Sequence, residues 1–152
     1  MILRTKGKAL NIFSHLVGKV TKDILKDQHG YFLLTDNINI DLLQKTNFLA
    51  IISTQKEFSF DTNNSIVYKV PTIDHLTEND IVSVGIDGNI NTLYRVNSFQ
   101  NTLLATERCN SNCLMCSQPP KDREDVPMLF DINTKLVSLI PKDCIEIGIS
   151  GG

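Results

Sequence analysis

Tryptophan is absent from this sequence, and no apolar run approaches the roughly 18 residues that a membrane-spanning helix needs. The basic N-terminus lacks the continuous apolar stretch and the small-residue cleavage site of a secretory signal. Neither sign of charge dominates, since 15 Lys and Arg face 17 Asp and Glu, for a net charge of -2. The sequence therefore predicts a cytoplasmic protein with no membrane span and no general basic surface for nucleic acid.

Several catalytic motifs are also missing. No Ser–His–Asp order, phosphate-binding glycine loop or carboxylate pair stands out. His15, His29 and His75 are scattered among turn-like segments, where a surface or hydrogen-bonded role is expected. Glu146 is an isolated acid in an apolar run, which is weak support for a polar site.

The charge is distributed unevenly along the chain. Residues 1–26 carry six Lys or Arg against the single acid Asp23, so this segment is +5 and the remainder is -7. Such a run usually forms a solvated face. The alternative is a weak docking surface for an acidic partner.

Residues 1–98 read as a small β-rich domain, with a barrel among its possible arrangements. Short β-branched or aromatic runs between turn residues predict strands over 31–34, 48–52, 65–70, 80–84 and 91–96. The Asp87-Gly88 pair predicts a hairpin turn between the last two. One short helix is expected within 36–45, capped by Asp36 or Asn37.

Residues 99–152 show a different order: strand, loop, helix, strand. Apolar residues predict strands over 103–105 and 144–149, and the long crossover between them indicates a parallel pair. Within 122–140 we expect an apolar helical face, interrupted at Asn133-Thr134 and formed by Val126, Leu129, Phe130, Leu136, Val137 and Ile140.

The strongest chemical signal is a group of three cysteines in that loop. Cys109, Cys113 and Cys116 have the spacing CxxxCxxC, and a disulfide framework is not expected without a secretion signal. Soft thiolates on one tight loop suit an iron–sulfur cluster. Three protein ligands to a [4Fe–4S] cluster leave one iron open, and an open position separates catalytic from structural metal sites.

Two other interpretations of the cysteines remain. The three thiols form part of a zinc site completed by His75 or Cys144, or they are inert. The position of the loop after an apolar strand favours the cluster, because sites in parallel α/β folds lie at the carboxyl ends of strands. Cys144 itself is expected to be a small buried core residue, or else a ligand to a further cluster.

The CxxxCxxC loop after a first strand, with Met115 just before the last cysteine, resembles the radical S-adenosylmethionine superfamily. In that superfamily the second strand ends in a Gly-Gly-Glu-type motif, and here the second strand ends in Ser150-Gly151-Gly152. The run 106–120, with residues 3–7, 79–84 and 93–95, is similar to the C-type radical SAM maturase of the His-Xaa-Ser repeat peptide system. The similarity covers only the N-terminal portion of such a maturase.

The resemblance implies an α+β fold: the β-rich domain 1–98, then residues 99–152 as the first βαβ unit of a truncated partial (β/α) barrel. It implies that Cys109, Cys113 and Cys116 hold a [4Fe–4S] cluster whose open iron binds S-adenosylmethionine. Gly151 and Gly152 would line the methionine site, and Met115 would lie near the adenine or simply pack in the loop.

The implied activity is peptide modification. The reduced cluster cleaves S-adenosylmethionine to a 5′-deoxyadenosyl radical, which abstracts hydrogen from a peptide substrate. An electron donor is required, and a partner maturase is a further expected partner. Members of the family continue beyond the position of Gly152, so we expect the 152-residue chain alone to be inactive. The competing class is a non-catalytic partner- or peptide-binding module with a structural metal or a remnant cysteine site.

Overall fold

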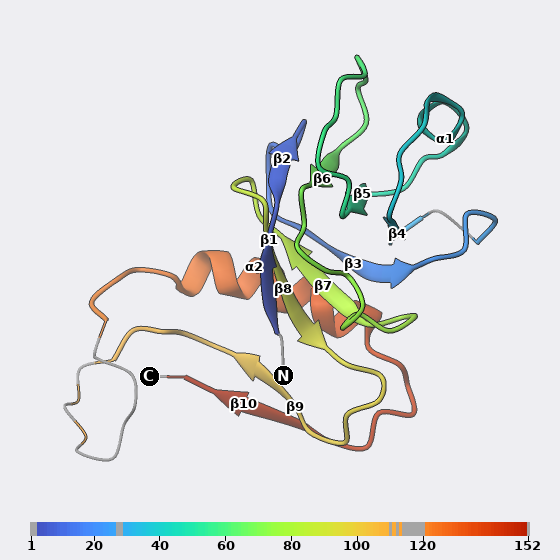
Figure 1. The fold of residues 1–152 in the computed structure, drawn as a ribbon. Coiled ribbons are helices and arrows are strands. Elements are labelled where there is room, and N and C mark those ends of the chain that lie inside the picture. The colour runs from blue at the N-terminus through green and yellow to red at the C-terminus, as the bar shows by residue number, and fades with distance from the viewer. Residues whose placement is uncertain (1–2, 27–28, 110, 112, 114–120, 152) are drawn as a thin grey trace.

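The computed structural model describes residues 3–26, 29–109, 111, 113 and 121–151 (Figure 1). The described part is mixed α+β, with a large sheet, a two-stranded sheet and few helices. Its elements are β1 (Arg4–Lys6), β2 (Lys8–Leu10), β3 (Leu16–Thr21), β4 (Tyr31–Thr35), α1 (Ile40–Lys45), β5 (Ala50–Ser53), β6 (Ile66–Tyr68), β7 (Ile81–Val84), β8 (Asn89–Tyr94), β9 (Asn101–Leu104), α2 (Val126–Leu139) and β10 (Ile147–Ser150).

The large sheet closes on itself. Its strand order is β1-β8-β7-β3-β4-β5-β6-β2, so its two outer strands are consecutive in the chain and are joined by Gly7. A Cβ on Gly7 would lie 2.5 Å from the Tyr68 carbonyl oxygen, so only glycine fits where the segment crosses between the sheet edges. Before Gly7, β1 pairs with β8, and after it, β2 pairs with β6. The result is the barrel-like sheet that the sequence suggested.

Alternate strand residues fill the interior of this barrel. On β4, Phe32 and Leu34 belong to the interior cluster, whereas Leu33 between them belongs to a cluster on the outside. Ala50 and Ile52 on β5 join the interior cluster. The interior is therefore a packed core, as in other small barrels, and the outer face needs cover from other elements.

The predicted strands between residues 31 and 105 all occur, with boundaries that differ by a few residues. The hairpin is confirmed: β7 and β8 are antiparallel, and Gly88 has a φ of 79° at the turn. The sequence does not predict β1, β2 or β3. In β3, Gly18 and Lys19 separate the apolar residues, which hides the alternation of a strand.

Helix α1 covers one part of the outer face, beside β4, β5 and β6. Leu42 of α1 and Ile38 before it pack against Ile51 and Ile66. The helix is shorter than expected, and its N-cap is Asn39, whose Oδ1 accepts from the Leu42 amide at 2.8 Å. The predicted caps, Asp36 and Asn37, are therefore wrong, because the Asn39 side chain is the one that accepts from an amide of the first turn.

Helix α2 covers the opposite part of the barrel with a face that the sequence predicts only in part. Ile132 and Leu136 are buried in a cluster with Val17 of β3 and Ile81 of β7. The polar pair predicted to interrupt the helix does not do so, because Asn133 donates its side-chain amide to the Leu104 carbonyl at 2.8 Å. The prediction of the apolar face is wrong at three positions whose side chains are exposed: Val126, Phe130 and Val137.

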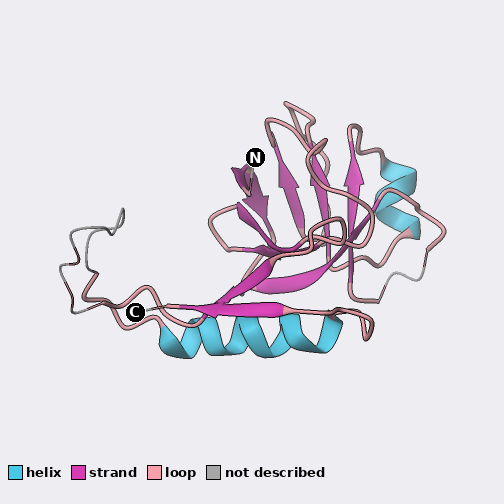
Figure 2. Ribbon diagram, turned by 90° about the horizontal axis from the view of Figure 1, so that it is seen from below, coloured by secondary structure: helices cyan, strands magenta, loops and turns pink. Residues whose placement is uncertain are grey.

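Strands β9 and β10 form a parallel ribbon, as the sequence predicts. Their register pairs Ile147 with Asn101 and Ser150 with Leu104. Figure 2 shows the axis of α2 running along the ribbon, so β9, α2 and β10 make one βαβ unit. Because α2 also packs on β3 and β7, this unit is attached to the barrel. The division of the chain at residue 98 and the identity of the unit as part of a radical SAM barrel stay predictions.

Candidate functional site

The carboxyl ends of β9 and β10 lie side by side. The Ala105 amide donates to the Ser150 carbonyl at 2.7 Å, which extends the ribbon by one residue. The chain then continues from β9 toward Cys109, and from β10 into Gly151. The two segments singled out in the sequence, the cysteine loop and the terminal glycines, therefore leave the same end of the ribbon.

Gly151 lies directly against Thr106. A Cβ on Gly151 would fall 2.9 Å from the Thr106 nitrogen and 3.0 Å from the Thr106 oxygen. Gly151 also has a φ of 152°, which side-chain-bearing residues rarely adopt. The close approach of the two backbones is enough to explain a glycine at this position. The absence of a side chain also leaves the Gly151 backbone accessible to a ligand.

A buried carboxylate holds the start of the loop. Asp125, only 2% exposed, accepts from the Thr106 hydroxyl at 2.6 Å and from the Glu107 amide at 2.8 Å. The Thr106 hydroxyl also accepts from the Arg108 amide at 2.9 Å. The bond from Thr106, followed by that from Glu107, lowers the pKa of Asp125, so the carboxylate is charged at neutral pH.

The two sides of the cysteine loop meet at its base. Arg108 and Lys121 form an isolated parallel bridge, and the Cys109 amide donates to the Lys121 carbonyl at 3.1 Å. Glu107 pairs with Lys121 at 3.0 Å, and Arg108 pairs with Glu124 at 3.3 Å. Exposed pairs of this kind stabilise a fold only slightly. Together with the backbone bridge, they bring the two sides of the loop together.

The described cysteines are Cys109, Cys113 and Cys144, and they form no disulfide. Cys109 is half-buried, Cys113 is exposed, and the Ser111 amide donates to the Cys109 sulfur at 3.4 Å. Within the described ranges, no three His, Cys, Asp or Glu side chains gather in a metal-binding group. The remaining predicted site residues, Cys116, Met115 and Gly152, lie outside those ranges.

The donor set nevertheless fits a soft metal or cluster. Two accessible thiols, Cys109 and Cys113, follow the carboxyl end of a parallel strand, and a backbone N–H already donates to one sulfur. Hydrogen bonds from backbone amides are the usual environment of thiolate ligands to iron–sulfur clusters.

The predicted additional zinc ligands do not approach this site. Cys144 precedes β10, whereas Gly151 and the loop lie at the strand's other end. His75 lies close enough to Arg95 for the Arg95 charge to act on it. The Arg95 amide donates to the Asn101 side chain at the start of β9, which is the end of the strand opposite the loop. Burial and then the charge of Arg95 lower the pKa of His75. Within the described residues, neither candidate ligand is near Cys109.

Cys144 belongs to the packing around α2. It is half-buried against the cluster of Ile132 and Leu136, close to the core position expected of it. The strand predicted over 144–149 starts later, at Ile147, because the Cys144 amide donates to the Pro141 carbonyl at 3.1 Å in the turn before β10. Burial, followed by a hydrogen bond with Cys144, raises the pKa of the neighbouring Tyr94.

An apolar groove of about 480 Å³ runs beside the start of the loop, and the sequence analysis did not identify it. The groove is lined by Ala105, Val126, Phe130, Asn133, Thr134 and Val137. Its wall is the exposed face of α2, and Phe130 is 71% exposed. The wrongly predicted core positions at 126, 130 and 137 were the only sequence signal for it.

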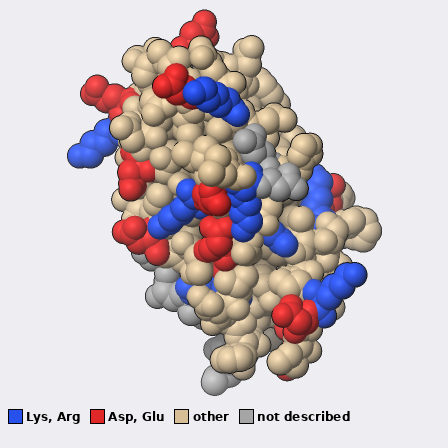
Figure 3. Space-filling model, turned by 90° about the vertical axis from the view of Figure 1, so that its right-hand side faces the viewer, with Lys and Arg blue, Asp and Glu red and all other residues tan. Residues whose placement is uncertain are grey.

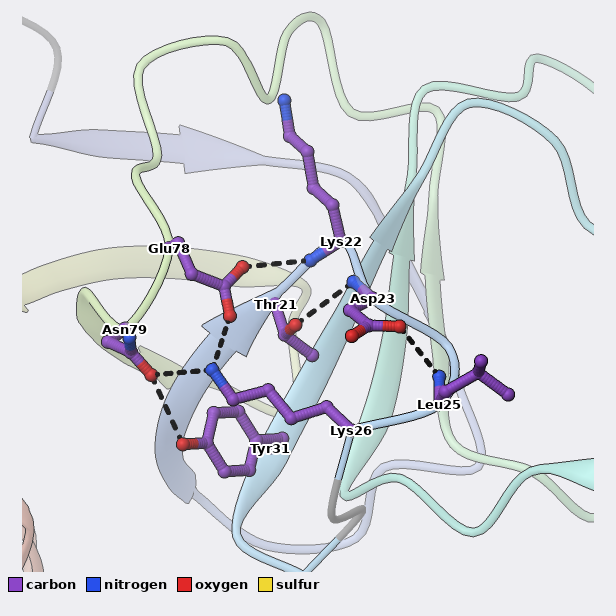
Figure 4. Close-up of polar contacts among 8 residues, drawn as sticks. All are labelled: Thr21, Lys22, Asp23, Leu25, Lys26, Tyr31, Glu78 and Asn79. Carbon is purple, nitrogen blue, oxygen red and sulfur yellow. Dashed lines mark hydrogen bonds and ion pairs between the residues drawn. The ribbon is translucent and has the colours of Figure 1, made fainter.

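Within the described residues, two of the six basic residues in 1–26, Lys6 and Lys26, form ion pairs with acidic side chains. Lys26 pairs with Glu78 at 2.6 Å and donates to the Asn79 side chain at 3.0 Å, and its ammonium lies 4.9 Å from the centre of the Tyr31 ring (Figure 4). Lys6 pairs with Asp87 at 3.7 Å. Figure 3 shows acidic and basic side chains interspersed over one face of the molecule. These pairs favour the solvated-face interpretation over a docking surface for an acidic partner.

Comparison with known proteins gives no relative: no protein-family model matches this sequence, and no curated protein matches it. Within the part of the chain that the structure describes, neither helix has both the length and the apolar character to cross a membrane. The functional conclusion therefore depends on the residues at the end of the β9–β10 ribbon.

Proposed function

We propose that this chain carries the cluster- and S-adenosylmethionine-binding end of a radical SAM peptide maturase. The observation that carries the proposal is the contact between Gly151 and Thr106, which joins two motifs far apart in the sequence. The parallel register of β9 and β10 supports it, because the ends of parallel strands are the usual positions of sites in α/β folds.

In this proposal, the residues of the chain have separate tasks. Cys109, Cys113 and Cys116 bind three irons of a [4Fe–4S] cluster, and Gly151 and Gly152 give the methionine part of the cofactor close access to the backbone. Met115 contacts the adenine. When bound, the reduced cluster supplies the electron that cleaves S-adenosylmethionine to a 5′-deoxyadenosyl radical for hydrogen abstraction from a peptide.

The partners follow from this chemistry. An electron donor must reduce the cluster, and a peptide supplies the C–H bond. The barrel has a packed interior, so we place peptide or partner-maturase contacts on its surface and not inside it. Cys113 itself is exposed, so such molecules can reach it.

Anaerobic reconstitution of the chain with iron and sulfide tests the proposal. We expect about four irons and four sulfides per chain, and a reduced electron paramagnetic resonance spectrum that changes when S-adenosylmethionine is added. One tightly bound zinc without such a change would instead identify a binding module with a structural metal. Uptake of neither metal would leave the cysteines as inert thiols and contradict the proposal.

A further inference from the structure

Asp125 occupies the N-cap position of α2 without capping the helix. The N-cap carboxylate usually accepts from a backbone amide of the first turn. Here no such bond forms, and both carboxylate oxygens instead accept from Thr106 and Glu107. A charged oxygen at a helix N-terminus remains favourable through the helix dipole. The orientation of the side chain is therefore explained by the loop, because the helix gains no hydrogen bond from it.

Thr106 connects three parts of the molecule. Its hydroxyl donates to Asp125 at 2.6 Å and accepts from the Arg108 amide at 2.9 Å, so it acts as both a donor and an acceptor. Its backbone lies against Gly151 at the end of β10. The residue thus touches the start of α2, the start of the cysteine loop and the glycine turn.

These contacts also tie the loop to the barrel. Asp125 begins the helix whose residues Ile132 and Leu136 are buried against β3 and β7. Because the helix is held by its core contacts, a carboxylate at its first turn is held as well. The start of the loop therefore has a defined position relative to Gly151, and the bond is short, buried and charge-assisted.

We propose that Asp125 and Thr106 are positioning residues that set the start of the cysteine loop against Gly151, and so align a bound cluster with the methionine part of S-adenosylmethionine. This inference rests on the proposed function. Neither side chain touches the cofactor in this arrangement; both act through the backbone between residues 106 and 109. Loss of the pair therefore weakens cofactor binding while leaving the thiols able to assemble a cluster.

The test compares Thr106→Val, which keeps the shape of the side chain but removes the hydroxyl, with Thr106→Ser, which retains it. In reconstituted protein we expect Thr106→Val to keep its iron and to bind S-adenosylmethionine about three- to tenfold more weakly, the usual range for one lost hydrogen bond. The change that the cofactor causes in the electron paramagnetic resonance spectrum should diminish in parallel. Thr106→Ser should restore both.

The matched control is Thr134→Val. The Thr134 hydroxyl makes a comparable bond of 2.8 Å to the Phe130 carbonyl, but this bond lies within α2 and does not involve the loop. Asp125→Asn is the second variant, because Oδ1 and Oδ2 each accept one of the two bonds, and the amide nitrogen that replaces one of these oxygens cannot accept. Asp131→Asn, which removes only an exposed pair with Lys135, is its control.

Each outcome decides a separate point. If wild-type protein takes up no cluster, both the proposed function and this inference are wrong. If wild-type protein loads normally and Thr106→Val and Asp125→Asn bind the cofactor as tightly as their controls, only the inference is wrong. If Thr106→Val does not fold, the same comparison is made with Asp125→Asn and Asp131→Asn.

Discussion

Gly151 approaches Thr106 so closely that a Cβ on the glycine would lie 2.9 Å from the Thr106 backbone nitrogen. The contact joins the end of β10 to the chain that follows β9, and it is reinforced by the bond from Ala105 to Ser150. Any side chain at residue 151 must therefore displace backbone, since no flexible group is available to move away.

We expect Gly151→Ala to weaken binding of S-adenosylmethionine to the reconstituted protein at least tenfold, because the new methyl group moves the glycine turn away from Thr106. Equilibrium titration followed by the spectrum of the reduced cluster measures this effect. Ser150→Ala, one residue earlier on an exposed position of β10, is the control and should bind normally. Equal affinities for the two variants would contradict the assigned role of Gly151.

Cys113→Ala should abolish stable cluster binding while leaving the free energy of unfolding nearly unchanged. Cys113 is exposed, and surface substitutions away from special features usually change stability by less than about 0.5 kcal/mol. Iron and sulfide analysis with thermal unfolding of the metal-free protein measures both. Cys144→Ala provides the reverse comparison: it removes a half-buried sulfur packed near α2, so it should lower stability and keep the cluster.

Asp80→Ala should destabilise the barrel by about 1–3 kcal/mol, which is the usual cost of leaving buried donors unsatisfied. Asp80 is fully buried, and its two oxygens accept from the Thr77 and Val96 amides at 2.9 Å each. Denaturant unfolding measures the loss. Asp74→Ala, which removes an exposed carboxylate, should cost less, and a similar loss for both would show that Asp80 has no special role.

The ion pair between Lys26 and Glu78 should make stability depend on acid pH. Burial acts to raise the pKa of Glu78, but hydrogen bonds from Lys26, Thr21 and the Lys22 amide outweigh it and lower the pKa below 4.5. A carboxyl group whose pKa falls on folding stabilises the protein above its unfolded pKa, and this contribution is lost as pH falls through the folded value.

We therefore expect the difference in unfolding free energy between wild type and Glu78→Gln to be present at pH 7 and to be lost as the pH falls from 4.5 through the lower pKa of the folded state. Because the Glu78 side chain is partly exposed, the difference should stay below about 1 kcal/mol. Denaturant unfolding at several pH values tests this. A difference that grows on acidification would have the wrong sign for this pair.

The two faces of α2 should respond differently to substitution. Leu136→Ala should cost about 2–5 kcal/mol, because Leu136 is buried between the helix and the barrel. Phe130→Ser should cost little, because most of the Phe130 side chain is already exposed. Thermal unfolding of the two variants measures the difference, and equal losses would mean that the helix packs through another face.

Sequence reasoning succeeded where the signal was local. The Asp87-Gly88 turn, the strands between residues 31 and 105 and the parallel crossover depend on turn chemistry, alternation and chain length. It failed for β3 and for the faces of α2. The alternation of β3 is broken by Gly18 and Lys19, which tolerate a strand only because β4 and β7 pair with it on both sides.

The candidate site divides in the same way. The three cysteine positions and the glycines are visible as motifs, and their chemistry follows from residue type. Asp125 carried no recognisable signal, because an aspartate before a helix normally predicts a cap. Only the approach of Thr106, two residues beyond the end of β9, turns the Asp125 carboxylate toward the loop.

The amino-acid order alone therefore determines most of the local elements after residue 30 and identifies the side chains that can bind a soft metal, because propensity, turn geometry and thiol chemistry act over a few residues. Closure of the barrel at Gly7, the choice of Ile132 and Leu136 as the buried face, and the contact of Gly151 with Thr106 each join segments distant in the chain. Packing decided these features, since each depends on a partner whose position exists only after the chain has folded.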